Sequence, residues 1–412
     1  MFSRSFKYVI FVFLMFFLSG CSLNYSNSKN NQISNTNIQN TSSINIKISA
    51  VGDIMAHQPQ LDAQYDVNTN SYNFDNNFKF IKKYINSSNL AIANLETTLR
   101  GEPYTSYPQF SSPDSLLTAL KNTGFDVIST INNHTNDTGK KGIKRTLEVI
   151  KEHNLDSVGT RNNLDEKNYI IKNVDGIKVG IAAFSYGDII SNNKYLNGLK
   201  VSSEISDLVN VIESNDSNKA FNRIKPILSD INTEGVDLTI VVVHWGEEYQ
   251  REPNNFQKEL AQLLCNEGVD IILGSHPHVI QPIEILSSAN SSNEETNETF
   301  VVYSMGNFLS NQRNEILNKF YTEDGIIPIF DIEKNLETNK TTIKKLEYIP
   351  TWVNKYYDNI KNKNVYEIIP YIQNDSFLST LDELTLKKLT KSYENTTSIM
   401  PNSDRISPMK SN

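Results

Sequence analysis

The sequence contains very little cysteine, which limits its covalent chemistry. Of 412 residues only Cys21 and Cys265 are cysteine. Cys21 lies in an N-terminal segment that we expect to be processed, so Cys265 would remain as a single thiol, which cannot form an internal disulfide. Cys265 falls within a predicted helix over 254–267, where packing is the expected role of a lone thiol and catalysis is not.

The sequence also lacks a block of positive charge. Its 39 Lys and Arg are outnumbered by 47 Asp and Glu, and the formal net charge is −8. Without a basic cluster, we predict that nucleic acid is not a partner. We find no internal repeat, and a hydrophobic content of 38% with 19 Tyr and 19 Phe is enough for a sizeable core.

The apolar run Tyr8 to Leu18 is too short to form a transmembrane helix comfortably. Arg4 and Lys7 precede it and Leu18-Ser-Gly-Cys21 follows, an order typical of a secretory signal peptide. The last four residues resemble the lipobox of bacterial lipoproteins, in which the cysteine becomes the lipidated first residue. We therefore predict a lipoprotein signal peptide over 1–20, lipidation at Cys21, and a lipid-anchored protein on the extracellular face of the cell membrane. The alternative is an ordinary signal peptide with an incidental cysteine.

Composition divides the rest of the chain into three parts. Residues 21–43 are rich in Asn and Ser and predict a flexible tether. Residues 44–350 carry the strand and helix signals of one domain, and within it 285–299 reads as a hairpin tip or flexible insertion. Residues 351–412 form a C-terminal extension that we expect to be partly helical, with a loose tail from Asn395.

Apolar, strand-like segments alternate with helical ones through the predicted domain. This alternation, with a β-rich end, predicts the α/β class. Strands are expected at 44–52, 90–95, 125–131, 177–184, 236–243, 269–273, 300–303, 326–330 and 342–349, and helices at 78–85, from 113, at 141–153, 221–234, 254–267 and 379–393.

Polar residues of a particular kind follow five of these strands. Five of the six histidines lie at such strand ends, whereas His153 lies at a helix terminus and is expected to be structural. If the strands are parallel neighbours, their carboxyl ends converge on one pocket. The residues at these ends are Asp53, His57, Glu96, Asn133, His134, His244, His276 and His278.

This set has the composition of a dinuclear hydrolytic metal centre. Such a centre needs neutral imidazoles, a bridging carboxylate and open positions for water. Each residue also has an ordinary explanation: Asp53 as a turn cap, Glu96 paired with Arg100, or His244 in the core. Taken as a set, they predict a site for two divalent ions, and this ligand chemistry suits Mn, Zn or Fe better than Ca.

The order of these residues resembles the motifs of the calcineurin-like metallophosphoesterases. It is closer still to the CapA capsule-synthesis family, which is associated with poly-γ-glutamate capsule. The resemblance spans about Ile46 to Leu309. It rests on Ala50-Val-Gly-Asp-Ile-Met-Ala-His57, Asn94-Leu-Glu-Thr97, Asn133-His-Thr-Asn-Asp-Thr-Gly139, Val243-His-Trp-Gly-Glu-Glu-Tyr249, Gly274-Ser-His-Pro-His278 and Tyr303-Ser-Met-Gly-Asn-Phe308.

The resemblance implies a layered metallophosphoesterase-like sandwich with mixed sheets and helices on the outer faces. It implies one metal held by Asp53, His57 and His278, a second held by Asn133, His244 and His276, Glu96 bridging the two, and His134 as general acid. Two features depart from the phosphoesterase pattern: His57 lies four residues after Asp53 instead of two, and Glu96 replaces the bridging Asp.

Three further residues are predicted to contact substrate: Trp245 and Glu248 in the loop after His244, and Asn307. The alternative for Asn307 is that it orients a metal-bound histidine. The resemblance implies a protein of poly-γ-glutamate synthesis or export, with the anionic polymer and capsule synthase membrane proteins as partners. The alternatives are a general extracellular phosphoesterase or amide hydrolase, and a non-catalytic scaffold that binds the polymer.

Overall fold

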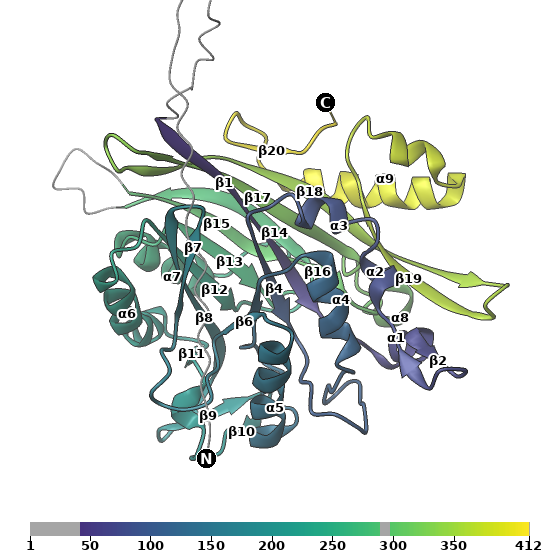
Figure 1. The fold of residues 1–412 in the computed structure, drawn as a ribbon, viewed down its shortest axis with the longest axis horizontal. Helices are drawn as coiled ribbons and strands as arrows, with labels where there is room; N and C mark the ends of the chain where they lie inside the picture. The colour runs from purple at the N-terminus through teal and green to yellow at the C-terminus, as the bar shows by residue number, and fades with distance from the viewer. Residues whose placement is uncertain (1–41, 289–296, 412) are drawn as a thin grey trace, which may run out of the picture. The chain divides into compact units, whose positions relative to one another are not determined.

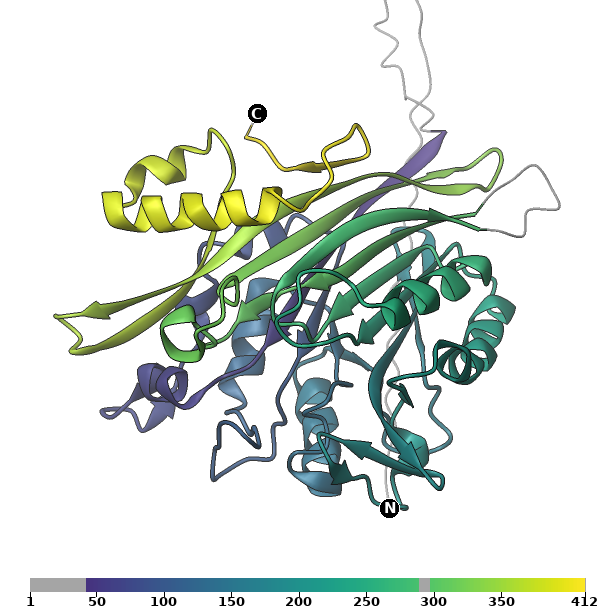
Figure 2. The same cartoon turned by 180° about the vertical axis from the view of Figure 1, so that it is seen from behind.

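We describe the protein from a computed structural model, shown in Figures 1 and 2. The structure describes residues 42–288 and 297–411. The predicted signal peptide, Cys21 and nearly all of the predicted tether lie outside the described residues. Within the described ranges, no helix is long and apolar enough to cross a bilayer.

The first of two large sheets begins with the N-terminal strand of the described chain. Its central strands β1, β4, β5 and β6 run parallel, and long antiparallel strands extend it on the other side of β1. The order is β19 (Lys363–Pro370), β18 (Thr341–Asp358), β17 (Asp324–Asn335), β1 (Ser43–Ile54), β4 (Leu90–Leu95), β5 (Val127–Ser129) and β6 (Asp156–Val158), with β16 (Asn307–Leu309) on β1 and β20 (Ile406–Pro408) on β18.

The second sheet has a parallel centre of β8, β12, β13 and β15. Its order is β10 (Leu199–Lys200), β9 (Asn193–Leu196), β8 (Ile177–Ile190), β12 (Leu238–His244), β13 (Ile271–Ser275), β15 (Glu298–Met305) and β14 (Ile280–Ser287), with β7 (Ile170–Val174) and β11 (Val211–Glu213) also paired to β8. A separate hairpin joins β2 (Tyr65–Asp66) to β3 (Ser71–Tyr72).

Alternate residues of the central strands pack on opposite faces of their sheet. In β12, Ile240 and Val242 face the other sheet, and Val241 and Val243 pack under helices. All seven residues of β12 are buried, as expected for a parallel strand that is covered on both faces. The two sheets therefore pack face to face around a shared apolar core.

Helices cover the outer faces of this pair of sheets (Figure 1). The second sheet is covered by α6 (Ser217–Thr233) and α7 (Asn255–Asn266). Asn254 caps α7, because its side chain accepts from the backbone N–H of Gln257. The remaining helices are α1 (Gln58–Gln64), α2 (Asp75–Phe78), α3 (Lys82–Ile85), α4 (Ser115–Thr123), α5 (Gly139–Glu152), α8 (Asn314–Leu317) and α9 (Glu383–Thr397), with short 3-10 turns η1 (Ser206–Leu208) and η2 (Ser376–Thr380).

This arrangement confirms the predicted layered α/β sandwich with mixed sheets and outer helices. The segment around 285–299 joins β14 to β15 as an antiparallel hairpin, as predicted, although 289–296 fall outside the described residues. The helix predicted over 78–85 is instead two short helices, α2 and α3.

The predicted domain end at 350 is wrong. It falls in the middle of β18, and β19 and β20 extend the same sheet beyond it. The predicted loose tail is also corrected, because α9 continues to Thr397 and β20 then pairs with β18. Leu389 of α9 packs against Trp352 and Ile369, so α9 lies along these strands (Figure 2).

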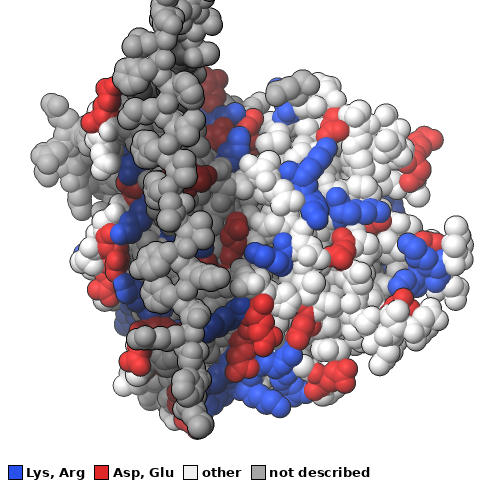
Figure 3. Space-filling model, viewed as in Figure 1, with Lys and Arg blue, Asp and Glu red and all other residues white. Residues whose placement is uncertain are grey.

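Positive and negative side chains are interspersed over the described residues on the face shown in Figure 3. Among the described residues visible there, no broad surface carries one sign. The predicted absence of a nucleic-acid partner stays a prediction.

Candidate metal centre

The polar strand ends of both sheets meet in one buried cluster. The first sheet contributes Asp53 from β1, Glu96 after β4, and Asn133 with His134 after β5. The second contributes His244 at the end of β12 and His276 and His278 after β13. The imidazole rings of His244 and His276 are 4.8 Å apart, so the predicted convergence of these strand ends is confirmed, although it involves two sheets instead of one.

Asp53 lies at the middle of the cluster and is fully buried. Its Oδ2 is 3.1 Å from Nδ1 of His278 and accepts a 3.3 Å hydrogen bond from the backbone N–H of His276. Its Oδ1 accepts from the side-chain amide of Asn94 at 2.8 Å and is 4.0 Å from Nδ1 of His244. Asp53 thus joins the first sheet to all three histidines of the second.

Glu96 is also fully buried, and neither of its carboxylate oxygens has a hydrogen-bond partner. Its Oε1 is 3.5 Å from Nε2 of His244 and 3.8 Å from Nε2 of His278. A buried carboxylate without hydrogen bonds is costly unless a proton or a cation compensates it. The position of Glu96 is therefore suited to a cation ligand.

Two of the histidines have a positive φ, a backbone conformation that residues other than glycine rarely adopt. His276 has φ of 102° and His278 has φ of 56°. Nδ1 of His276 is buried without a hydrogen-bond partner. Strained backbone of this kind persists where the surrounding structure enforces it, and it gathers at functional sites.

Burial keeps most of these imidazoles neutral. Burial lowers the pKa of His57 and of His244 to about 4, and it lowers the pKa of His276 well below its usual range. Neutral imidazole is the form that coordinates a metal.

The charged groups of the cluster depend on one another. Burial disfavours the imidazolium of His278, but the charge of Glu96 and the hydrogen bond to Asp53 raise its pKa to about 9. Burial alone would raise the pKa of Asp53, yet the hydrogen bond and charge of His278 bring it below the ordinary value. Burial, with the nearby charge of Asp53, raises the pKa of Glu96 well above its usual range.

Two groups of donor atoms are close enough to share an ion. Glu96, His276 and His278 form one group, and Asp53, Glu96 and His244 form the other, with the ligand atoms of each group within 4.8 Å of one another. The composition differs from the two predicted ligand sets, which paired Asp53 with His278 and His244 with His276. Glu96 belongs to both groups, and its bridging role stays a prediction.

Asn133 and His57 lie beside this cluster. Oδ1 of Asn133 is 3.0 Å from Nε2 of His244. His57, by contrast, belongs to neither donor group: its Nδ1 accepts from the backbone N–H of Asn311 at 3.2 Å, and its ring packs edge-on against Phe110. The role of His57 as a ligand stays a prediction.

His134 is held by a carboxylate. Its Nδ1 is 2.7 Å from Oδ2 of Asp137, and the same oxygen accepts from the backbone N–H of Phe110 at 2.6 Å. The ring of Phe110 packs edge-on against the His134 ring. This arrangement fixes the imidazole and directs Nδ1 toward Asp137, and the role of His134 as general acid stays a prediction.

The three residues predicted to contact substrate differ in their burial and in their contacts. Trp245 is fully buried and its indole N–H donates to the backbone oxygen of Tyr303, so this prediction is corrected: it is a core residue with no surface for substrate. Glu248 is exposed in the loop after His244, and a substrate contact there stays a prediction. Oδ1 of Asn307 is 3.1 Å from Nδ1 of His278, which matches the alternative orienting role.

Sequence reasoning assigned no role to two residues that help to build the site. Asn94 lies between Asp53 and His244, with its amide nitrogen 3.4 Å from Nδ1 of His244. Tyr186 stacks on His244 and packs against His276 with ring centroids 4.6 Å apart. Asn94 lies in the last two residues of β4 and Tyr186 lies within β8, so their positions in the chain give only a weak signal of these contacts.

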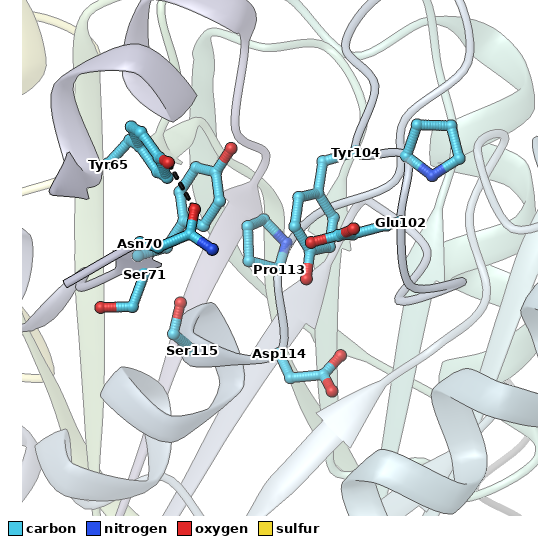
Figure 4. A pocket seen from close by; sticks show the side chains of 10 residues that line it. Tyr65, Asn70, Ser71, Glu102, Tyr104, Pro113, Asp114 and Ser115 are labelled. Atoms are coloured by element: carbon cyan, nitrogen blue, oxygen red, sulfur yellow. Dashed lines mark hydrogen bonds between the residues drawn. The ribbon is translucent and has the colours of Figure 1, made fainter. Parts of the chain in front are cut away.

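A separate pocket of about 750 Å³ lies between the β2–β3 hairpin and the segment around 102–115 (Figure 4). Tyr65, Tyr72 and Tyr104 line it together with Glu102 and Asp114. None of the candidate metal ligands contributes to it. Of its two carboxylates, Asp114 is paired with Arg145 at 2.7 Å.

Comparison with known proteins gives matches over most of the chain. The sequence model of the bacterial capsule synthesis protein PGA_cap family matches residues 47–312. A capsule biosynthesis protein CapA of Bacillus anthracis is 28% identical over 302 residues, which are 70% of this chain and 66% of the relative, just under two thirds. A PGA biosynthesis protein CapA of Bacillus subtilis (strain 168) is 28% identical over 334 residues, 78% of this chain and 76% of the relative.

Two solved structures are similar at a lower level. A phosphatase of Mycoplasma pneumoniae aligns with a TM-score of 0.42 and 15% identity over 83% of this chain and 99% of its own. The calcineurin-like phosphoesterase YfkN of Bacillus subtilis aligns with a TM-score of 0.42 and 15% identity over 86% of this chain and 98% of its own. The family match covers more than half of the chain and includes all the residues of the buried cluster. The chain therefore belongs to the bacterial capsule synthesis protein PGA_cap family.

Proposed function

We propose that the chain is a lipid-anchored, metal-dependent hydrolase that acts on poly-γ-glutamate outside the cell during capsule synthesis or export. Family membership supports the link to capsule. The observation that carries the metal-dependent part is Glu96, a fully buried carboxylate whose two oxygens have no hydrogen-bond partner and which lies among three histidines.

The donor set fits divalent cations. Asp53, Glu96, His244, His276 and His278 are the residues that would hold them, with Asn133 adjacent. When bound, such cations supply positive charge that polarises the substrate and lowers the pKa of water. Carboxylate and imidazole ligands without thiolate favour Mn, Zn or Fe, and we propose two ions because two donor groups share Glu96.

His134 is the proposed general acid. When the bond between the electrophilic centre and the leaving oxygen or nitrogen breaks, the leaving atom takes the bonding electrons and needs a proton. Nδ1 of His134 faces Asp137, whose carboxylate stabilises the imidazolium form, and Nε2–H of that imidazolium is the group that would donate the proton. At 5% exposure, His134 is nearly buried but not sealed from the surface.

The test of this function is His134→Ala in the full-length protein. We expect turnover to fall by roughly a hundredfold to ten-thousandfold with metal content unchanged, because the substitution removes a general acid and no metal ligand. Hydrolysis would be measured on poly-γ-glutamate and, separately, on a phosphodiester reporter. His153→Ala is the matched control, because His153 contacts Thr118 and Val149 and no residue of the cluster.

Activity on the reporter alone would favour the general phosphoesterase. If the metal-loaded protein binds the polymer and cleaves neither substrate, the hydrolase proposal is wrong and the chain is a polymer-binding scaffold.

The proposed anchor rests on Cys21 and the apolar run before it. A single acyl chain binds a membrane only weakly, so stable anchoring needs the multiply acylated end of a bacterial lipoprotein. We expect Cys21→Ala to move the protein from the membrane fraction to the medium or to leave it unprocessed, as judged by fractionation and mass spectrometry. A processed variant that still fractionates with the membrane would refute the anchor.

A further inference from the structure

A second cavity, of about 400 Å³, lies on the outer side of the second sheet between α6, β11 and the loop after β6. Apolar side chains such as Phe184 and Ile212 form its wall. Three cationic side chains also line it: Arg161, Lys194 and Arg223. The volume is in the range of small-ligand sites in proteins.

Two of the three cations have no carboxylate partner. The ammonium group of Lys194 donates to the backbone oxygens of Ser206 and Val209. The guanidinium of Arg161 donates to the backbone oxygens of Glu166 and Asp207, and its Nε is buried without a hydrogen-bond partner. Within the described residues, neither side chain lies within ion-pair distance of an acidic group.

The other charges around the cavity do not neutralise these two cations. Arg223 is paired with Glu213 at 2.8 Å. Asp207 also lines the cavity and its charge raises the pKa of Lys194, but its carboxylate is exposed, so water screens it. Burial lowers the pKa of Lys194, which means that its charged form is held there at a cost. Half-buried cations that face a cavity and have no ion-pair partner are the chemistry of an anion site.

The cavity is connected to the candidate metal centre by one short hairpin. Lys194 lies in β9, and three residues later Asn197 lies at the turn between β9 and β10. Oδ1 of Asn197 is 3.4 Å from the amide nitrogen of Asn133, and its own amide nitrogen is 3.5 Å from the ring nitrogens of His134. The position of β9 thus bears on the proposed general acid.

We propose that this cavity binds a phosphate or carboxylate group through Arg161 and Lys194, and that the bound anion holds the β9–β10 hairpin against His134. The site is separate from the metal centre and does not depend on the proposed hydrolase activity. It gives the protein a place to sense an anionic ligand at a distance from the residues that would react.

The test is isothermal titration of full-length, chelator-treated protein with orthophosphate and with the dipeptide γ-glutamylglutamate at constant ionic strength. Chelation removes anion binding that depends on metal. The absence of binding in this experiment would therefore refute the anion site and leave the proposed hydrolase activity untouched. We expect saturable binding of at least one anion, weakened roughly tenfold or more by Lys194→Met or Arg161→Gln, because each removes a charged hydrogen-bond donor. Lys200→Met, on the same hairpin but outside the cavity, should bind as the wild type does.

Hydrogen exchange over residues 193–200 measures the coupling. The bound anion should slow exchange in the wild type and not in Lys194→Met. Binding of phosphate alone identifies a phosphate-bearing ligand, and binding of the dipeptide alone identifies a carboxylate-bearing one. No saturable binding of either anion, or equal affinity in all variants, would overturn the site, and unchanged exchange on binding would overturn the hold on the hairpin.

Discussion

At the scale of single residues, the cluster is a set of polar groups whose burial is compensated within the site. Asp53 accepts from Asn94, His276 and His278, whereas Glu96 has no hydrogen-bond donor at all. A buried carboxylate without a partner lowers the free energy of unfolding. Proteins tolerate such a loss of stability where function requires the group. Of the residues in the cluster, Glu96 is the one whose burial is least explained by folding alone.

Asp137 tests whether the support of His134 matters for catalysis. We expect Asp137→Asn to lower turnover by roughly 10- to 100-fold with metal content unchanged, as is typical when the partner that orients a functional histidine is lost. The amide can donate to Nδ1 and favours the wrong tautomer of His134. Steady-state kinetics and metal analysis would check this. Turnover equal to the wild type would mean that Asp137 only shapes the turn before α5.

The sequence predicted which residue types meet in the site, because a histidine or carboxylate after a buried strand has a position that topology determines. It did not predict the role of Trp245, since an indole in a loop can face outward or inward. It also gave no role to Asn94 or Tyr186, whose contacts depend on how the two sheets face each other.

At the scale of elements, close backbone approach between strands positions the ligands. A Cβ on Gly52 would lie 2.0 Å from the backbone oxygen of Gly306, and the next residue, Asp53, pairs in register with Asn307. Only glycine allows this approach. The contact places Asp53 beside His278, which Asn307 also holds.

We therefore expect Gly52→Ala to lower the free energy of unfolding by about 1–3 kcal/mol and to lower metal content as well, because β1 must shift and Asp53 shifts with it. Denaturant unfolding and metal analysis would check both effects. Gly268→Ala is the control: it has φ of 91° with no atom near its Cβ position, so it should cost stability through backbone strain alone and keep its metal. Normal metal content in Gly52→Ala would contradict this account of the contact.

The strands that were predicted correspond to β1, β4, β5, β8, β12, β13, β15, β17 and β18, because each of these contains a distinct apolar run. Others, such as β6, β7, β14 and β19, were not predicted. The single helix predicted over 78–85 was wrong, since the apolar spacing does not reveal the break between α2 and α3. The end of the domain was misplaced because β18 and β19 are polar on their outer ends and resemble an extension until their pairing is seen.

At the scale of the whole molecule, the cluster exists because two parallel-centred sheets present their carboxyl ends to the same place. Asp53 and Glu96 come from one sheet, and His244, His276 and His278 come from the other. An α/β class could be predicted from the sequence, but the division of the strands between two sheets could not, because it depends on long-range pairing such as β1 with β17.

The central claim is that these sheet ends together form a metal centre, and Glu96→Gln tests it most directly. Full-length protein would be loaded with Mn, Zn or Fe in turn, dialysed, and measured by mass spectrometry for metal per chain. We predict that the wild type retains metal in stoichiometric amount. The metal affinity of Glu96→Gln should fall by more than the roughly 10- to 100-fold that is typical when a residue hydrogen-bonded to a metal ligand is replaced. Glu367→Gln, the same change at a buried glutamate paired with Lys79, should retain metal. A wild type that binds no metal, or a Glu96→Gln variant that binds as much as the wild type, would contradict the account.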